Sequence, residues 1–563
     1  CAWIDAGQLV PEENETNNVN CQPITISSSV PTGAFDITVS SNCAVVSPSY
    51  DGYSQSVAIS LERSDGHSSP VSFSSWADSG VAGTFSPASL LGSIDGTTVL
   101  AITVDSSLSA GTYTVTVEAT DGITTHSEAI DLTILGSTAG SGLSFAKSTL
   151  SAGGTDAYGF TLSVKSDGSV QSWGSNGFGE LGNNDIGINS DVAVDVLGPD
   201  GSTSLQNIVA VATGRTHALA LREDGTVWSW GQANSGQLGI GRVGISVVFP
   251  AGDPIGYVPF AVPVCGLTDI VAIAAGDSHS LALNNVGQVY SFGNNTWGQV
   301  GDGSTDDKIM PVEVMGTATE VFGDTSIIAA GHFHSLAVDT SGNAYAWGRN
   351  EYGPLGNLDL GVDSAYPVAV VDESGSPINN IVDIDGGYAH SLALDSSGVV
   401  YGWGDNYWGQ LADTSMDTSA PHSDQARDYS DEVTALSAYT VTDIEAGADN
   451  SLVIISGAML GFGWGALGQN GDGNAAERDY TPIALVFPSS TVDPVSVSAL
   501  GSHVAVLSQN SSGSDGTVYV FGDDREGQLG IGGASDSCTL GTEVVTCEKT
   551  PVMVSAATQV MLP

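Results

Sequence analysis

The sequence has very few positively charged side chains. Lys and Arg account for only 12 of its 563 residues, against 63 Asp and Glu, which gives a formal net charge of −51 at pH 7. Nucleic acids and anionic membrane surfaces are bound by clustered Lys and Arg, so we expect neither as a direct partner. Because the acids are scattered, their charge favours solubility in a salty medium, and capture of cationic partners is the alternative.

Catalytic and zinc-binding motifs are also missing. The sequence contains no GxSxG nucleophile elbow, no HExxH motif and no GxxxxGK[ST] phosphate loop. Its six cysteines form no CxxC pair, which argues against a zinc site. We therefore expect a protein that is not an enzyme and that has no cofactor, with calcium as the open possibility.

The cysteines suggest disulfides instead. Cys21 and Cys43 bracket the start of a strand-rich segment, and Cys538 and Cys547 bracket the short insertion SCTLGTEVVTC. We expect both pairs to form disulfides, which implies an oxidising compartment. Cys265 lies in the apolar stretch VPVCGLTDIV, which indicates a buried thiol.

Long hydrophobic runs are absent. No stretch approaches the roughly 20 apolar residues that a membrane-spanning helix needs. The chain begins at Cys1 and continues as a polar segment rich in Asn and Glu, and this start resembles a mature bacterial lipoprotein after signal-peptide removal. The resemblance implies a lipid anchor on Cys1 as the only link to a membrane. An arbitrary chain boundary, or a disulfide of Cys1, is the alternative.

The pattern along the chain divides it into four parts. Residues 22–136 alternate apolar and polar side chains between Gly, Ser and Asp turns, as strands of a β-sandwich do. Phe85–Leu90 and Leu108–Gly122 resemble the immunoglobulin-like modules of bacterial surface proteins, which implies a spacer domain. The predicted parts are a tether (1–21), an immunoglobulin-like sandwich (22–136), a linker (137–154) and a repeat domain (155–563).

Seven segments of the repeat domain share one layout. An aromatic–Gly pair marks each copy, and successive aromatics are 57, 62, 55, 56, 59 and 59 residues apart. Most copies carry a GxxHSLAL segment upstream, then an Asp-Gly-type turn, which predicts two strands of a hairpin. The marker aromatics are Trp173, Trp230, Phe292, Trp347, Trp403, Phe462 (in a degenerate copy) and Phe521.

A hairpin of this kind exposes an apolar face and is not stable alone, so copies must pack side by side. A radial arrangement of seven copies closes the ring and leaves few exposed edges. The GxxHSLAL segment, the WGxNxxGQLG loop and the period together resemble the regulator-of-chromosome-condensation (RCC) repeat over residues 155–563. The resemblance implies an all-β fold, a seven-bladed β-propeller behind the sandwich. It also implies closure by a shared blade, with Gln559–Leu562 adding a strand to the blade near Phe160.

Histidines recur at one position of the repeat. A ring of histidines suggests a metal site or a pH sensor, but recurrence follows from the repeat itself, and successive blades hold equivalent residues too far apart for one zinc ion. We therefore expect a structural role, which the RCC resemblance also implies. The residues are His217, His279, His334, His390 and His503, with Phe160 and Asn450 in the other two copies.

Large aromatics recur in the WG loops, at Phe178, Trp297, Tyr352 and Trp408. If these loops share one rim, the four side chains are a candidate binding surface, because Trp and Tyr commonly anchor interfaces. Local packing is the alternative. Acidic loops at Gly301–Asp307, Asp413–Glu432 and Gly468–Glu477 offer oxygens for calcium, but none follows the twelve-residue calcium loop, so solvated turns are the simpler interpretation.

These features predict a binding or adhesion protein outside a bacterium-like cell, lipid-anchored to the outer membrane through Cys1. Its propeller loops would face a protein or glycan partner. The alternative is a structural subunit that self-assembles into a surface filament, layer or complex. A secreted enzyme or enzyme inhibitor is the remaining possibility, and convergent carboxylates at the propeller axis would favour an enzyme.

Overall fold

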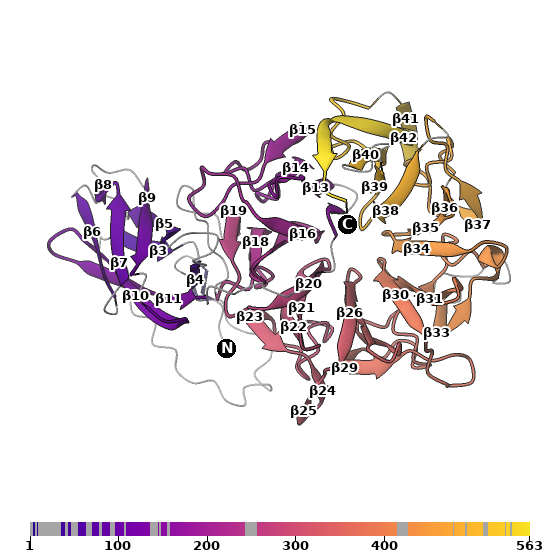
Figure 1. Ribbon diagram of the computed structural model, residues 1–563, viewed down its shortest axis with the longest axis horizontal. Helices are drawn as coiled ribbons and strands as arrows, with labels where there is room; N and C mark the ends of the chain where they lie inside the picture. The colour runs from indigo at the N-terminus through magenta and orange to yellow at the C-terminus, as the bar shows by residue number, and fades with distance from the viewer. Residues whose placement is uncertain are drawn as a thin grey trace.

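In the computed structural model, the described part of the chain is built from β-strands, with one short 3-10 turn, η3 (Thr434–Leu436) (Figure 1). The described residues are 70–77, 81–90, 96–105, 108–135, 145, 148–154, 158–241, 256–413, 426–476, 478–489, 492–509, 516–534, 536–540 and 543–562, together with the backbone of the strands that precede residue 70.

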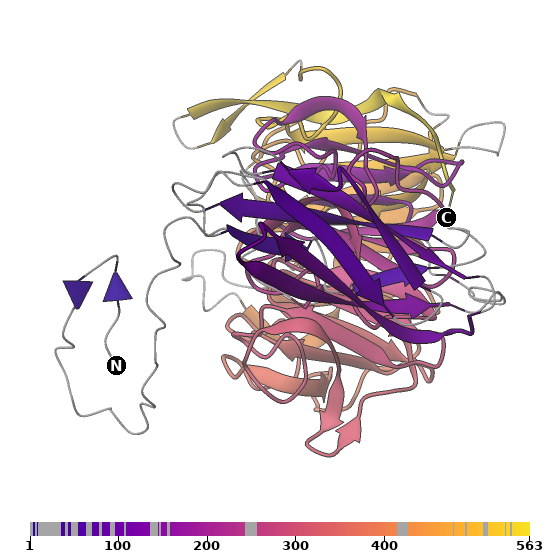
Figure 2. The ribbon, with the colours of Figure 1, turned by 90° about the vertical axis from the view of Figure 1, so that its left-hand side faces the viewer.

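Two sheets precede residue 136 and share one core. Side chains on β10 are buried alternately, at Val115, Val117 and Ala119, and they pack against Leu100 and Ile102 of the other sheet. Figure 2 views the molecule from their side, with these indigo strands in front. One sheet has the order β3 (Phe35–Val39), β5 (Ser54–Arg63), β9 (Gly96–Val104), β7 (Val81–Ser86). The other has the order β4 (Cys43–Val46), β11 (Thr125–Ile134), β10 (Gly111–Thr120), β6 (Val71–Ala77), β8 (Ser89–Leu90).

After residue 148, sheets of one pattern follow each other round a common centre (Figure 1). Each is antiparallel, and its strands run outward from the centre in sequence order, except that β42 precedes β41 in the last sheet. The first three are β12 (Leu150–Gly153), β13 (Phe160–Val164), β14 (Val170–Gly174), β15 (Ser190–Asp195); β16 (Ile208–Thr213), β17 (His217–Arg222), β18 (Val227–Gln232), β19 (Tyr257–Pro263); and β20 (Ile270–Ala275), β21 (His279–Asn284), β22 (Val289–Gly293), β23 (Lys308–Glu313).

The next three are β26 (Thr325–Ala330), β27 (His334–Asp339), β28 (Ala344–Gly348), β29 (Ser364–Ala369); β30 (Ile381–Gly386), β31 (His390–Asp395), β32 (Val400–Asp405), β33 (Ala426–Glu432); and β34 (Val441–Ala446), β35 (Asn450–Ile455), β36 (Ala458–Gly463), β37 (Asp479–Ala484). The last contains β38 (Asp493–Ser498), β39 (His503–Gln509), β40 (Gly516–Asp523), β42 (Glu543–Val560) and β41 (Asp536–Leu540). Two small pairs, β1 (Ile4–Asp5) with β2 (Gln8–Leu9) and β24 (Met315–Thr317) with β25 (Glu320–Val321), lie outside these sheets.

The repeated hairpin forms the middle of every sheet, as the sequence pattern predicts. In the second sheet, His217 of β17 is opposite Gly231 of β18, and Leu221 is opposite Val227. The turn between the two strands has Gly225 at φ +80°, a left-handed conformation that favours glycine. The Asp-Gly dipeptide of the repeat therefore fixes the hairpin register.

The aromatic of each WG pair packs on the preceding sheet. Trp230 of the second sheet is fully buried with Phe160 and Leu162 of the first. Trp173 of the first sheet is likewise buried among Leu507 and Val518 of the last sheet. The first and last sheets therefore contact each other as neighbours do elsewhere in the ring.

Two boundaries differ from the sequence prediction. The first sheet begins at Leu150, inside the predicted linker 137–154, because β13 needs a partner on its inner edge and Leu150–Gly153 supplies it. Residues Gln559–Leu562 do not add a strand beside Phe160, because β12 and β14 already occupy both edges of β13. The end of β42 pairs with β40, and it touches the first sheet through a bridge to Lys165 and a hydrogen bond from Met561 N–H to the Val164 carbonyl.

The structure joins Cys538 to Cys547. The prediction of a free thiol at Cys265 is wrong: the side chain is buried, but it takes part in a disulfide. Apolar surroundings bury a thiol and a disulfide equally well, so composition alone did not separate the two. Cys1, Cys21 and the side chain of Cys43 lie outside the described residues. None of the helical structure described here is long and apolar enough to cross a membrane.

Candidate functional site: the loop face and the axial cavity

The WG loops connect the third and fourth strands of each sheet, and buried side chains hold them rigidly. In the third sheet, Gln299 Oε1 accepts the Trp297 N–H at 2.9 Å, and Asn295 Oδ1 accepts the Val300 N–H at 3.0 Å. Equivalent Gln and Asn contacts recur in other loops, for example at Gln410. The residue two before the Gln is therefore fixed by its own N–H, and this is the position of Trp297 and Trp408; Glu180 accepts the Phe178 N–H in the same way.

Trp297 and Tyr352, two of the predicted rim residues, both lie near Arg349. The guanidinium carbon of Arg349 is 4.8 Å from the centre of the Trp297 ring and 5.4 Å from the Phe333 ring. Tyr352 and Arg349 both line a small cavity that also includes Phe333 and Tyr388. Cation–π contacts of this kind stabilise the arrangement by about 0.5–2 kcal/mol each, so the cluster is preformed.

Trp408, the third predicted residue, belongs to a second cluster. Its ring is 4.8 Å from that of Tyr407 and 6.1 Å from that of Trp464. The Arg478 guanidinium lies over both Tyr407, at 4.0 Å, and Trp408, at 5.0 Å. Trp408 therefore packs partly against other residues of the protein. This is what the local-packing alternative to a binding role predicts.

Phe178, the fourth, pairs with Tyr158 at 5.9 Å, and Arg215 lies 5.8 Å from the Tyr158 ring. All four predicted rim residues are half-buried. The sequence analysis named these aromatics but not the arginines beside them. The scarcity of Lys and Arg could have identified these arginines. The chain has only 12 basic residues, and three of them lie beside these aromatics or, for Arg215, beside Tyr158, the partner of Phe178.

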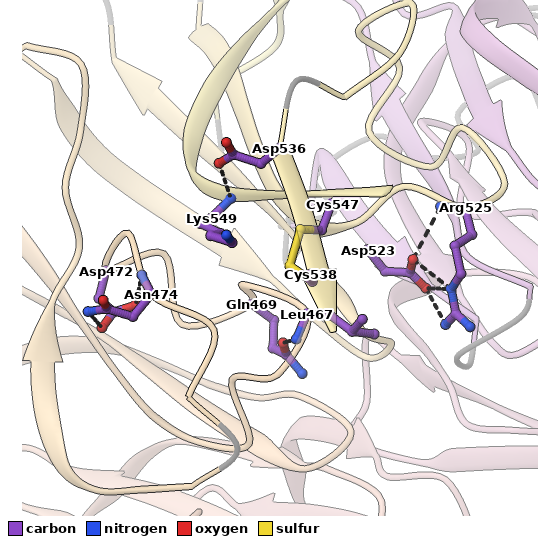
Figure 3. Close-up of a disulfide and its surroundings, with 10 residues drawn as sticks. All are labelled: Leu467, Gln469, Asp472, Asn474, Asp523, Arg525, Asp536, Cys538, Cys547 and Lys549. Carbon is purple, nitrogen blue, oxygen red and sulfur yellow. Dashed lines mark hydrogen bonds and ion pairs between the residues drawn. A yellow bond between two sulfur atoms is a disulfide. The ribbon is translucent and has the colours of Figure 1, made fainter. Parts of the chain in front are cut away.

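We call the side of the ring formed by the WG loops the loop face, and β41 with the start of β42 the disulfide hairpin. Figure 3 shows this hairpin beside Leu467, which belongs to the WG loop of the sixth sheet. Cys538 and Cys547 join β41 to β42 and pack with Val545 on Trp464 and Leu467 of the preceding sheet. This contact explains why the sixth repeat departs from the WGxNxxGQLG pattern. Its loop carries apolar side chains because another part of the chain covers it.

The recurring histidines connect neighbouring sheets. Each is buried, and its Nε2 lies 2.9–3.0 Å from a hydroxyl of the next sheet. That hydroxyl donates its only proton to a loop carbonyl, so it accepts from the imidazole, which fixes the neutral Nε2–H tautomer. The pairs are His217–Ser280, His279–Ser335, His334–Ser391, His390–Ser451 and His503–Thr161.

Burial lowers the pKa of each of these five histidines to about 3, and neighbouring histidines lower it further in four of them. Because these buried imidazoles are neutral at pH 7, they are suited to hydrogen bonding between sheets rather than to proton exchange. The geometry supports the structural role expected from the sequence.

The calcium interpretation of Gly301–Asp307 meets a competing contact. Asp302 forms an ion pair with Lys308 at 2.7 Å, and Asn295 Nδ2 donates to oxygens of Asp302 and Ser304. Positive and amide groups thus already use the oxygens that a cation would need. In Gly468–Glu477, Asp472 accepts hydrogen bonds from Asn474. Most of Asp413–Glu432 lies outside the described residues, and among the described residues no group of three His, Cys, Asp or Glu side chains is arranged so that it could hold a metal ion.

A cavity of about 380 Å³ lies between the inner strands at the centre of the ring. Asp383 and Asp385 of β30 and Asp443 and Glu445 of β34 line one side of it. Burial raises the pKa of Asp383 to about 6, of Asp385 to about 7 and of Asp443 to about 8; that of Glu445 is also well above its usual value. Sequence analysis missed this cluster, although VDID and TDIE interrupt otherwise apolar inner strands.

Sheets of one pattern arranged round a centre define a β-propeller. The RCC1-like domain family matches residues 139–506, and the chain belongs to this family. The ultraviolet-B receptor UVR8 of Arabidopsis thaliana is 30% identical over 374 residues, which cover 65% of this chain and 76% of UVR8. The E3 ubiquitin-protein ligase HERC2 of Homo sapiens is 29% identical over 379 residues, which cover 66% of this chain but only 7% of HERC2.

Solved structures agree with this fold. Human WBSCR16 aligns with a TM-score of 0.54 at 20% identity, over 69% of this chain and 94% of that one. Yeast RCC1 (Prp20), solved bound to Kap60, aligns with a TM-score of 0.54 at 20% identity, over 71% of this chain and 86% of that one. At this level of identity the likeness shows the fold alone.

Proposed function

We propose that this protein is a binding protein on the outside of a cell and that the loop face of its propeller contacts a protein partner. In this proposal the sheets after residue 148 are the seven blades of one ring. The two sheets before residue 136 are an immunoglobulin-like spacer.

The observation that carries the proposal is the composition of the loop face. Trp, Tyr and Arg dominate the binding energy of protein interfaces, because each combines a large contact area with a polar group. Here Trp297, Tyr352 and Tyr388 gather round Arg349, and Tyr388 is 39% exposed. Their contacts with each other order them before any partner binds, which lowers the entropic cost of binding. A glycan is the other ligand that such aromatics suit.

The test compares two variants of the full chain. Trp297→Ala combined with Tyr352→Ala removes two half-buried aromatic side chains of the cluster. Tyr439→Ala is the matched control, because Tyr439 is 44% exposed and lies between β33 and β34, where the chain crosses from one sheet to the next. Each immobilised protein is used to recover partners from a surface extract of the source cells and is also probed on a glycan array.

We expect the double variant to recover at least about tenfold less of the wild-type partner, which corresponds to about 1.4 kcal/mol, and the control to recover the same amount. Equal recovery by all three proteins contradicts the proposal. Analytical ultracentrifugation covers the structural alternative: growth into long assemblies without a foreign partner would favour a filament or layer subunit.

A further inference from the structure

The axial cavity is acidic on one side and apolar on the other. The inner strands β16, β20 and β26 present Ala212, Ala274 and Ala329 to it, whereas β30 and β34 present the four carboxyl groups and β38 and β12 present hydroxyls. Inner strands are the edges of their sheets, so some of their N–H groups face the cavity and need acceptors.

On the polar side, side chains supply these acceptors across the gaps between sheets. Asp385 Oδ2 accepts the Ala446 N–H at 2.7 Å, and Glu445 Oε1 accepts the Ala499 N–H at 2.5 Å. Ser498 Oγ accepts the Ala152 N–H at 3.0 Å, and Ser151 Oγ accepts the Thr213 N–H at 3.1 Å. Each bond runs from one inner strand to the next, and the third of them joins the last sheet to the first.

The alanines of the apolar side cannot form such bonds. The chain of four bonds is therefore confined to the part of the ring where its two ends meet. No peptide connection joins the last sheet to the first, so hydrogen bonds and packing alone hold that junction.

Among the described residues, no Lys or Arg lines the cavity beside the carboxyl groups. Among the described residues that line the cavity, those from β12, β16, β20, β26 and β38 are Ser, Thr, Ala, Val and Ile. Next to the lining residue Leu500, His332 Nε2 is 3.0 Å from the Leu500 carbonyl and His332 Nδ1 is 4.0 Å from Asp277. Asp277 in turn pairs with Arg215 at 3.7 Å. Four carboxyl groups on two neighbouring strands thus repel each other in a half-buried space.

We propose that the axial carboxyl groups form a proton-dependent clasp: Asp385 and Glu445 join β30, β34 and β38 through their bonds to backbone N–H groups, and loss of protons from the cluster weakens this part of the ring through like-charge repulsion. The acid cluster needs no bound ligand for this role.

The sign of the effect follows from the raised pKa values. The unfolded chain releases these protons near the ordinary pKa of Asp, 3.8, whereas the folded chain keeps them until pH 6–8. The stabilising contribution is therefore complete below pH 4 and is lost as the pH rises through 6–8.

The experiment measures urea unfolding of the full chain at several pH values between 6 and 9. Asp383→Asn combined with Asp443→Asn removes charge and leaves the bonds of Asp385 and Glu445 in place. Asp372→Asn is the control, because hydrogen bonds from Ser374 lower the pKa of Asp372, which is therefore ionised at every pH used. Glu180 and Asp524, whose pKa values are raised to about 7 and 6, are unchanged in all variants.

We expect the wild-type and Asp372→Asn midpoints to fall with rising pH and the double variant to lose part of that slope, because Asp385 and Glu180, whose pKa values are raised to about 7, are unchanged in it. Ser498→Ala should lower the midpoint equally at every pH, because it removes the bond between β38 and β12 without removing charge. A double variant with the full wild-type slope would overturn the proposal.

Discussion

A double-mutant cycle on His334 and Ser391 tests how the sheets are joined. His334 Nε2 lies 2.9 Å from Ser391 Oγ, and that hydroxyl donates to the Pro354 carbonyl at 3.0 Å. Ser391→Ala leaves a buried N–H without an acceptor, which costs about 1–3 kcal/mol. The Pro354 carbonyl keeps a second donor, Trp403 Nε1 at 2.7 Å, so it adds little to that cost.

His334→Phe removes the donor instead. Ser391 still donates to Pro354, so we expect a loss of only about 0.5–1.5 kcal/mol from the missing bond, plus any cost of fitting the larger ring. The double variant reproduces a pair that the chain already contains, Phe160 followed in the next sheet by Ala218. It should therefore be more stable than the sum of the single effects predicts, by about 1 kcal/mol or more.

Urea unfolding at pH 7 measures the cycle, with the fluorescence of buried tryptophans as the signal. The propeller contains five tryptophans that are at most 2% exposed, so the signal reports on the ring. His217→Phe with Ser391→Ala is the control pair, because these residues are not hydrogen-bonded to each other and should be additive within about 0.5 kcal/mol. Additivity in the His334–Ser391 pair as well would refute the assignment of that hydrogen bond.

Three further changes have definite expected outcomes. Glu180→Gln should raise the free energy of unfolding by about 2 kcal/mol at pH 8 and by less than half of that at pH 5, since burial raises the pKa of Glu180 from 4.5 to about 7 and ionisation is then costly; pH-dependent urea titrations measure the difference. Gly331→Ala should destabilise the ring by several kcal/mol, because an added methyl group would overlap the His334 ring; an unchanged melting temperature would contradict it. Replacing Cys538 and Cys547 by Ser should make the β41–β42 hairpin sensitive to limited proteolysis while the far-ultraviolet circular dichroism is preserved, and an uncut hairpin would show that packing alone secures it.

The repeat made most of the ring predictable. Each copy carries its own hairpin, its own turn glycine and its own marker aromatic, so the third and second strands of a sheet follow from local sequence alone. The inner strand at Leu150–Gly153 was harder to find, because only four residues pair with β13 and no GxxH segment follows them. A short strand defined by its partner has little local pattern of its own.

The candidate site was predictable only in part. Trp297 and Tyr352 stand out because they recur at one loop position, but Arg349 lies in a different place in its repeat and reaches Trp297 across a blade boundary. The axial carboxyl groups are similar: Asp385 and Glu445 are 60 residues apart in sequence yet face the same cavity, since each is the fifth residue of an inner strand. Aligning the inner strands, in addition to the loops, would have predicted their convergence.

The irregular copies show that the interface between sheets, rather than the hairpin, determines which residues can change. Where Phe160 replaces the histidine, the next sheet has Ala218 in place of the acceptor hydroxyl, so neither partner is left without a bond. The side chain of Asn450 instead donates to the Gln469 carbonyl within its own repeat. At the position of the acceptor hydroxyl, the next sheet has Val504. The apolar loop around Trp464 follows the same rule, because the hairpin of the last sheet covers it. A departure in one repeat is thus matched by a departure in the adjacent repeat, which means that the order of the blades can be inferred from paired irregularities as well as from sequence order.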